Sequence, residues 1–179
     1  IEQVQHTGTD TLSGSGTNFG NSVRLSYNHP VKEIVACFAD SGDAPSTTSD
    51  ATVVIDASGC PRYDHFVGDN SEEAVGRLNG EMKLMLNGQD RAKAQGAKYY
   101  NQMLPFQYYQ GAPQAGVYVY PFALKPGDAL QPSGTCNFSR IGNAQLDIKE
   151  AAVAALNLFA VNWSVLRISS GLGGVAFSN

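Results

Sequence analysis

The chain has 179 residues, a net charge of −4 and an isoelectric point near 5.2, and only 16% of its residues are charged. Its length suits one domain with its own core, its acidic balance argues against binding a phosphate backbone, and no apolar run reaches the ~20 residues that span a bilayer. The charged fraction is below the ~25% of typical soluble domains, which indicates surface that other domains or subunits cover.

Most of the chain is predicted to form short strands separated by turn residues. The strands alternate in hydrophobicity or are rich in β-branched residues, and we expect them at Ser22–Tyr27, Lys32–Ala39, Glu81–Leu86, Val117–Leu124, Thr135–Ile141, Gln145–Lys149, Asn162–Ser169 and Gly174–Phe177. A further strand is expected from about Ala155, although the alanines before it favour helix. Asn87-Gly88 predicts a tight hairpin. This spacing predicts an all-β fold, an antiparallel β-sandwich.

Two segments interrupt the strands. A short helical insert is expected at Arg91–Gln102, because Asp90 is a suitable N-cap and alanines follow it. Residues Ser41–Asn79 are polar and rich in Ser, Thr, Asp and Gly, which predicts a long surface loop. Within this loop, Val53–Ile55 is expected to form a small extra strand that holds it to the sandwich.

The apolar patterns of two expected strands indicate which of their faces are buried. Val117–Leu124 is apolar on both faces, so one face is expected to pack between the sheets and the other to need a neighbour. In the last strand, Val175 and Phe177 are expected to face the core. The glycines of Gly171–Ala176 fit the dinucleotide pattern G-x-G-x-x-A, but only three residues follow, and the pattern requires a helix there. We interpret these glycines as a bend between the last two strands.

No catalytic, cofactor or metal site is expected. The three cysteines are odd in number and the histidines are scattered, which indicates neither a disulfide framework nor a metal site; these residues are Cys37, Cys60, Cys136, His6, His29 and His65. Glu72-Glu73 and Glu81 are interpreted as solvated charge rather than an acid–base pair. Two N-glycosylation patterns occur, at Asn137 and Asn162, but both lie in expected strands rather than in loops.

The segment FALKPGDALQPSGTCNFSRI, from Phe122 to Ile141, closely resembles the signature of major capsid proteins of nucleocytoplasmic large DNA viruses, best in the chlorella-virus and iridovirus branch. Other stretches agree in order; among them are Ile1–Gln5, Asn28–Pro30, Leu86–Arg91, Ala115–Tyr118 and Val165–Ile168. Residues Ser41–Asn79 match no such relative, and Asp147–Ala155 is shorter than the chlorella-virus loop. Glycosylation sites of those relatives are therefore not carried over.

The resemblance implies a structural protein, not an enzyme, with a jelly-roll fold. Residues 1–179 would be a single domain, the second (C-terminal) jelly roll of a double-jelly-roll subunit, with 41–79 as a long surface loop within it. Its implied partners are the N-terminal jelly roll, two further copies in a trimeric pseudo-hexagonal capsomer, neighbouring capsomers, minor capsid proteins and glycans. Direct contact with nucleic acid and membrane insertion are not implied. The expected location is the icosahedral capsid shell of the virion, after synthesis in the host cytoplasm.

A carbohydrate-binding β-sandwich used in viral attachment is the alternative function. Aromatic residues could line a sugar-binding surface, namely Tyr99, Tyr100, Phe106, Tyr108 and Tyr109. Packing in a core or an interface is the commoner use of such residues. An exposed aromatic cluster would favour the alternative.

Overall fold

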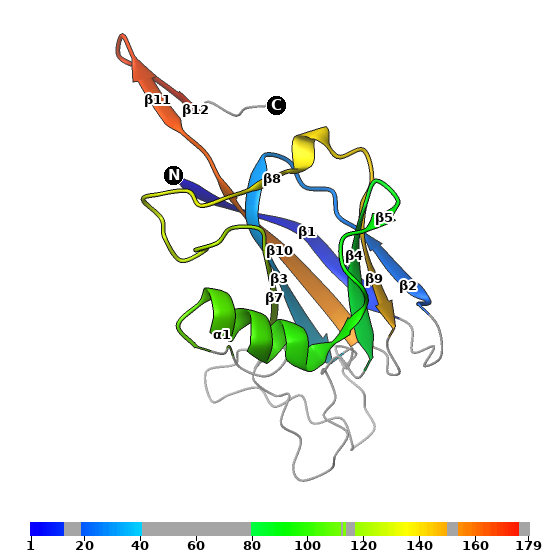
Figure 1. Cartoon of the computed structure of the whole chain (residues 1–179). Coiled ribbons are helices and arrows are strands. Elements are labelled where there is room, and N and C mark those ends of the chain that lie inside the picture. The colour runs from blue at the N-terminus through cyan, green and yellow to red at the C-terminus, as the bar shows by residue number, and fades with distance from the viewer. Residues whose placement is uncertain (13–18, 41–79, 112, 114–116, 150–153, 176–179) are drawn as a thin grey trace, which may run out of the picture.

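A computed structural model describes residues 1–12, 19–40, 80–111, 113, 117–149 and 154–175. Two antiparallel sheets face each other across one core (Figure 1). The first sheet has the order β1 (Glu2–Leu12), β10 (Ala154–Trp163), β3 (Pro30–Asp40) and β7 (Val117–Pro121), and β8 (Cys136–Asn137) also pairs with β3. The second has the order β2 (Asn21–Arg24), β9 (Ala144–Lys149), β4 (Glu81–Leu86) and β5 (Gln89–Asp90), and β6 (Gln95–Gly96) also pairs with β4.

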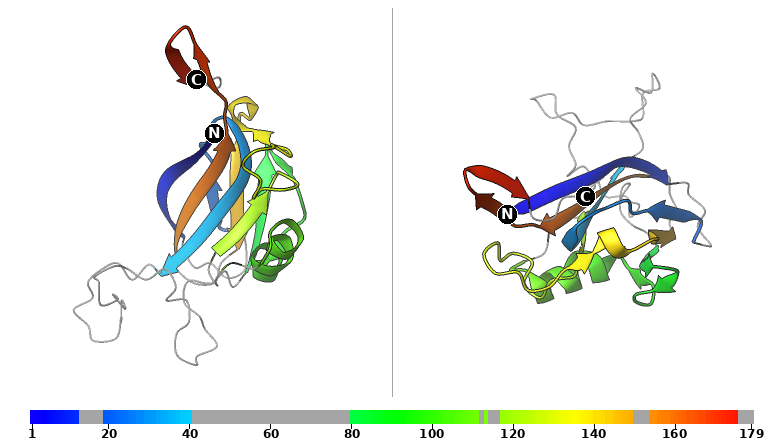
Figure 2. Two further views of the ribbon diagram at one scale, coloured as in Figure 1. Left: turned by 90° about the vertical axis from the view of Figure 1, so that its left-hand side faces the viewer. Right: turned by 90° about the horizontal axis from the view of Figure 1, so that it is seen from above.

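The path of the chain alternates between the two sheets. It runs from β1 to β2, β3 and β4 with a change of sheet at each step, and from β7 to β9 and β10 in the same way. Apart from β4 with β5 and β6, neighbouring strands in the two sheets are therefore distant in sequence, which is the connectivity of a jelly roll. The predicted all-β jelly-roll sandwich is confirmed, and Figure 2 shows its two layers from the side.

The core lies between the sheets and follows the two-residue period of the strands. In β10, Leu156, Leu158 and Ala160 are all 0% exposed, and in β3, Phe38 is also 0% exposed. Met82 and Leu84 in β4 face them from the other sheet and are 3% and 2% exposed, respectively. Burying a Leu or Phe side chain of this kind contributes about 1.5–3 kcal/mol. This central packing holds the sheets together.

The hairpin between β4 and β5 forms as predicted. Asn87 and Gly88 have φ angles of +53° and +79°, the left-handed pair that a two-residue turn between twisted strands requires. The Asn87 side chain also accepts hydrogen bonds from the backbone N–H groups of Gly142 and Asn143, at 3.1 and 3.2 Å. The turn is thereby fixed to the loop before β9.

Several predicted strands are longer than the observed ones. Ser22–Tyr27 ends at Arg24, and Asn162–Ser169 is divided between the end of β10 and a separate strand, Leu166–Ser169. Val117–Leu124 stops at Pro121, because the N–H groups of Phe122 and Ala123 both donate to the carbonyl of Lys32. Thr135–Ile141 contains only β8 and then the 3-10 turn η2 (Phe138–Arg140). The Asn137 side chain accepts from the N–H of Ser139, 3.1 Å away, and this local bond turns the backbone out of the strand.

A helix follows β6, but the predicted bounds Arg91–Gln102 are wrong. The helical stretch contains η1 (Tyr99–Met103), a π-helical segment, and α1 (Leu104–Tyr108). Asp90 belongs to β5 and pairs with Lys83 at 3.1 Å, so it does not cap the helix. Formation of the β4–β5 hairpin fixes Asp90 in a strand, so the alanines after Asp90 do not begin a helix there in spite of their helix propensity.

The helix packs against β7, an edge strand of the first sheet. The Asn101 side chain donates to the carbonyl of Val117 at 2.7 Å, and the hydroxyl of Tyr100 donates to the carbonyl of Met82 at 2.7 Å. The helix therefore contacts both sheets. The second apolar face of β7, which carries Val119, was predicted to need a neighbour. Val119 is only 9% exposed, so this face is covered.

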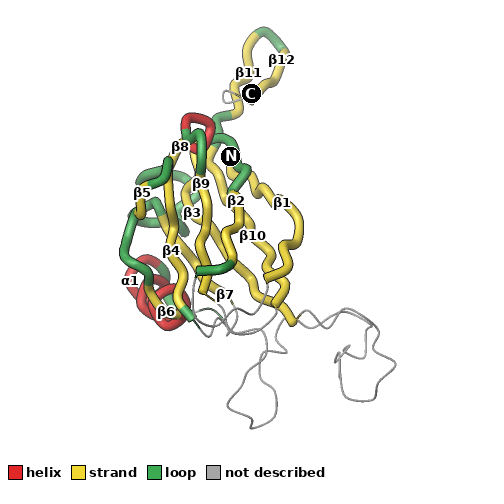
Figure 3. The backbone as a smooth tube through the Cα atoms, turned by 90° about the vertical axis from the view of Figure 1, so that its right-hand side faces the viewer, coloured by secondary structure: helices red, strands yellow, loops and turns green. Residues whose placement is uncertain are grey.

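The chain's last two strands leave the sandwich. β11 (Leu166–Ser169) and β12 (Leu172–Val175) form a separate two-stranded sheet that projects from the body in Figures 1 and 3. The expectation that Val175 faces the core is wrong, because its strand pairs only with β11 in the described residues. Phe177 lies outside those residues, as do Ser41–Asn79 with Val53–Ile55.

Candidate assembly surfaces

The residues considered for chemistry are spread over the fold. His6 stacks on Phe159 with ring centroids 4.6 Å apart, and His29 occupies the turn before β3 with φ +68°. No group of three His, Cys, Asp or Glu among the described residues could hold a metal ion. Burial raises the pKa of the thiols of Cys37 and Cys136, which keeps both protonated. Glu81 is exposed, while Cys60, His65 and Glu72-Glu73 lie outside the described residues.

The aromatic residues considered for sugar binding mostly pack internally. Tyr100 is 1% exposed and contacts Tyr99 edge-on at 5.0 Å, and Tyr108 packs against the core. Tyr109 is half-buried. Phe106, 83% exposed, is the one of the five that projects into solvent. These residues do not form the exposed cluster that the carbohydrate-binding alternative requires, and that alternative is not supported.

Residues 165–175, which we call the arm, form an exposed apolar surface. Leu166, Ile168 and Leu172 are 49%, 73% and 77% exposed. The register pairs Leu166 with Val175 and Ile168 with Gly173. Side chains alternate in strands, so these four residues share one face, while Arg167, Ser169 and Leu172 lie on the other. One side of the arm is therefore apolar, and glycine keeps it flat.

The root of the arm is joined to the start of the chain. The N–H of Ser164 donates to the carbonyl of Ile1 at 2.8 Å, and the amino group of Ile1 donates to the carbonyl of Ser164 at 2.7 Å. Beside this pair, Trp163 Nε1 and Ser164 Oγ are buried with no hydrogen-bond partner in the described part of the chain. A buried polar atom without a partner costs about 1–3 kcal/mol. The two backbone bonds between Ile1 and Ser164 therefore hold the root of the arm in spite of this cost.

Residues 122–134, which we call the signature loop, form a second exposed apolar surface. The Ser133 hydroxyl accepts from the N–H of Lys125 at 2.7 Å, and Asp128 Oδ1 accepts from the N–H groups of Leu130 and Gln131 at 2.9 and 3.1 Å. These bonds lower the pKa of the Asp128 carboxyl, the Gln131 N–H most strongly. Leu130 is 86% exposed. The loop is thus ordered by polar bonds and presents apolar side chains, including Leu124, to solvent.

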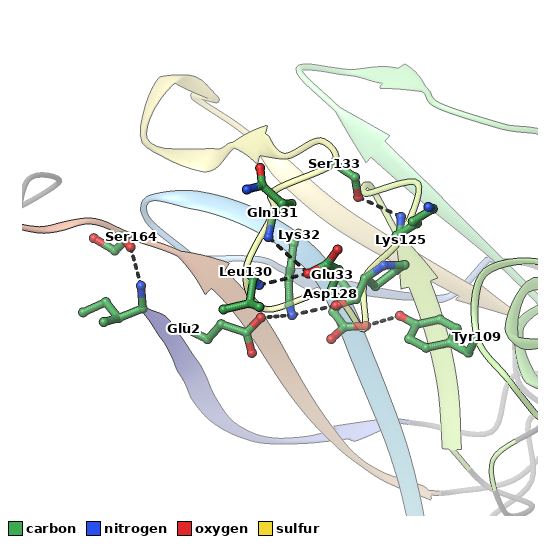
Figure 4. Close-up of polar contacts among 12 residues, drawn as sticks. Glu2, Lys32, Glu33, Tyr109, Lys125, Asp128, Leu130, Gln131, Ser133 and Ser164 are labelled. Atoms are coloured by element: carbon green, nitrogen blue, oxygen red, sulfur yellow. Dashed lines mark hydrogen bonds and ion pairs between the residues drawn. The ribbon is translucent and has the colours of Figure 1, made fainter.

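A buried lysine holds the signature loop to the sandwich. The side chain of Lys32 is 8% exposed, forms an ion pair with Glu2 and donates to the carbonyl of Pro126 at 2.7 Å (Figure 4). Lys32 is in β3, Glu2 in β1 and Pro126 in the loop. A buried charge is tolerated only when it is paired and hydrogen-bonded. These bonds therefore fix the position of the loop over the first sheet.

Next to Lys32, Glu33 links the sheet to the helical segment. The Tyr109 hydroxyl donates to the Glu33 carboxylate, as Figure 4 shows. Burial raises the pKa of Glu33, and the bond from Tyr109 opposes that rise. Burial and the adjacent carboxylate both raise the pKa of Tyr109, so its hydroxyl remains a donor. The pair fastens the end of the helix to β3.

The two glycosylation patterns lie in different environments. Asn162 is 0% exposed, donates to Gln3 at 3.0 Å and accepts from Gln5 at 3.1 Å. Its amide therefore joins β10 to β1 and is not accessible to a glycan in the folded chain. Asn137 is exposed, although its side-chain oxygen caps the turn at Ser139.

The sequence patterns did not identify the exposed leucines as surface residues. Leu166 and Ile168 fit a buried strand pattern, Leu172 was placed in the glycine-rich bend, and Leu124 was placed in a strand. The predicted bend between the last strands is confirmed at Gly171, since Ser170 and Gly171 have φ angles of +52° and +78°, but Gly173 and Gly174 lie in β12 rather than in the bend. This bend was the one sequence signal that the last two strands pair with each other as a hairpin.

A jelly roll with ordered, apolar protrusions is typical of proteins that build larger assemblies rather than of monomeric enzymes. No helix of the described residues is long and apolar enough to cross a membrane. The family described as "Large eukaryotic DNA virus major capsid protein" matches residues 1–174. The chain belongs to this family of viral structural proteins, whose members are virion components.

Individual relatives agree with the family. The chain is 36% identical to the major capsid protein of Paramecium bursaria Chlorella virus 1 and 33% identical to that of Phaeocystis pouchetii virus, in both cases over 100% of this chain and 48% of the relative. A solved structure of the PBCV-1 virus capsid superposes with a TM-score of 0.70 and 31% identity, covering all of this chain and 51% of the solved one. The chain therefore spans about half the length of the relatives it matches.

Proposed function

We propose that residues 1–179 are the second, C-terminal jelly roll of a double-jelly-roll capsid subunit. Three subunits would form a pseudo-hexagonal capsomer of an icosahedral shell. The match of this one jelly roll to about half of each relative supports the division of the subunit. The role is structural and not enzymatic, and the subunit would reach the virion after synthesis in the host cytoplasm.

The signature loop is the observation that carries this function. A loop of this kind costs conformational entropy to order, and Leu130 at 86% exposure gains nothing from burial within the chain. The loop is nevertheless held by Lys32, Asp128 and Ser133. An ordered loop with exposed leucines is suited to a contact with another subunit, where the leucines lose their exposure to water.

Other partners follow from the same assignment. Neighbouring capsomers and minor capsid proteins would contact further exposed apolar residues, such as Met103 and Phe106 on the helix, 56% and 83% exposed. Residues 41–79 would form a long loop on the outer surface of the particle. Glycans, where present, would be attached at exposed positions, with Asn137 a better acceptor than Asn162. With 16 acidic against 12 basic residues, the jelly roll would contact neither the genome nor the interior of a membrane.

The test is the assembly of the full-length subunit, with Leu124→Ser and Leu130→Ser combined. Light scattering should give the mass of three subunits for the unchanged protein. The double variant should lose trimers or particles, while its melting temperature stays the same because both side chains are exposed. Ala129→Ser, in the same exposed loop, is the matched control and should assemble normally.

Two results would count against the proposal. A full-length subunit that stays monomeric at all concentrations would contradict the capsomer. Normal trimers and normal particles from the double variant would contradict the role of the signature loop.

A further inference from the structure

The arm needs cover that the described chain does not supply. Two-stranded hairpins are at best marginally stable alone in water. In the described residues, both strands of the arm pair only with each other, and all four residues of β11 are exposed. Figure 2 shows the arm extending away from the sandwich in both views. An ordered arm of this kind indicates a partner surface outside the described residues.

The apolar face of the arm is shaped for close contact. Leu166, Ile168 and Val175 lie on this face, and Gly173 lies between them, opposite Ile168. A Cβ built at Gly173 would meet nothing within 4 Å. The absence of a side chain there is therefore not required by the arm itself, and it lets another backbone approach the strands closely.

The position of Ile1 indicates which neighbour covers the arm. Ile1 and Ser164 exchange two backbone hydrogen bonds, so any chain preceding Ile1 leaves the sandwich at the root of the arm. The relatives are about twice as long as this chain.

We propose that the arm docks onto the jelly roll that precedes Ile1 in the same subunit, with the face formed by Leu166, Ile168 and Val175 buried in the contact. This inference rests on the proposed function, because it requires a preceding jelly roll. The arm then acts as a clamp between the two halves of one subunit. Arg167 and Leu172, on the opposite face, remain outside the clamp.

The test places a photo-crosslinking amino acid in the full-length subunit, as Ile168→benzoylphenylalanine. Irradiation should join the arm to a peptide that precedes Ile1, and the product should run as one subunit on a denaturing gel. Arg167→benzoylphenylalanine, one residue away on the opposite face, is the matched control and should give that product in several-fold lower yield. Because a bulky probe can displace the arm, Val175→benzoylphenylalanine repeats the test from the other strand.

The inference is overturned by products that join two subunits, by crosslinks confined to residues 1–179, or by the same product yield at Arg167 as at Ile168 and Val175. Absence of any product at both Ile168 and Val175 overturns it as well. Light scattering on the same samples separates this result from the proposed function. Trimers with crosslinks between subunits refute the clamp alone, whereas a subunit that forms no trimers refutes the capsomer.

Discussion

β10 and β11 are separated by two residues, yet their apolar side chains have opposite environments. Leu156 and Leu158 of β10 are 0% exposed, whereas Leu166 and Ile168 of β11 are 49% and 73% exposed. Both strands alternate and both are antiparallel. The difference is that β10 lies between two strands in a sheet covered by a second sheet, while β11 has one partner and no second layer in the described residues. An apolar pattern thus defines a strand but not the layer that covers it.

The largest expected effect separates these two environments directly. Leu158→Ala should lower the free energy of unfolding by about 2–5 kcal/mol, because it leaves a cavity between the sheets. Leu172→Ala, the same substitution at a position 77% exposed in the arm, should change it by less than about 0.5 kcal/mol. Urea unfolding of both variants measures the difference. Equal losses would show that the arm is packed as tightly as the core.

The ion pairs provide the same comparison for charged groups. Lys32→Met should cost about 1–3 kcal/mol, because it leaves Glu2 and the carbonyl of Pro126 without their buried partner. Glu2 is a third exposed, which keeps the cost below that of a fully buried pair. Asp90→Asn weakens the more exposed pair between Lys83 and Asp90, leaves Lys83 paired with Asp147, and should cost at most about 1 kcal/mol. A smaller loss for Lys32→Met in thermal unfolding would contradict the role of Lys32 in holding the signature loop.

A turn gives a smaller effect. Gly88→Ala should cost about 1 kcal/mol, because φ is +79° there and an L side chain is strained in that region. Gly142→Ala has no positive φ, and its Cβ would be 3.9 Å from the nearest side-chain atom, so stability should be unchanged or slightly raised. Chemical unfolding compares the two. An unchanged Gly88→Ala variant would mean that the β4–β5 hairpin is not the tight turn described above.

The smallest expected effect is a pH dependence from Glu33. Burial raises its pKa above the ordinary 4.5, so between 4.5 and the raised pKa the folded state retains a proton that the unfolded state has lost. Stability contributed by this group therefore falls as pH rises through that window. Glu33→Gln should remove this fall while Gln still accepts the hydrogen bond from Tyr109. Unfolding curves from pH 4 to 7.5 test it, and an unchanged slope in the variant would contradict the assignment.

The sequence was sufficient where local chemistry determines the structure. The bounds of β4 agree with the prediction, and its hairpin follows from Asn87-Gly88, because only a few residues tolerate the left-handed backbone that the turn needs. β10 begins at Ala154, close to the predicted Ala155. In these cases the hydrophobic pattern and the turn residues predict the same element, and tertiary contacts stabilise that element.

The sequence was insufficient where a contact outside the periodic pattern determines the structure. The helix starts later than predicted, because Asp90 pairs with Lys83 across a hairpin instead of capping a helix. Val175 was predicted to face the core, but its strand pairs with β11 away from the sandwich. The hydrophobic periodicity of the sequence predicts neither the order of the strands in the two sheets nor the position of the signature loop. The resemblance of Phe122–Ile141 to capsid proteins supplied the family, which the match to residues 1–174 confirms.

The central claim is that side chains exposed on this jelly roll are covered in the assembled shell. Hydroxyl-radical footprinting of Leu124 and Leu130, compared between intact particles and the dissociated full-length subunit, tests it most directly. We predict strong labelling of both leucines in the dissociated subunit, where they are 72% and 86% exposed, and strong protection in particles. Leu158, 0% exposed, is the internal control and should be protected in both. Equal labelling of Leu124 and Leu130 in both samples would contradict the account.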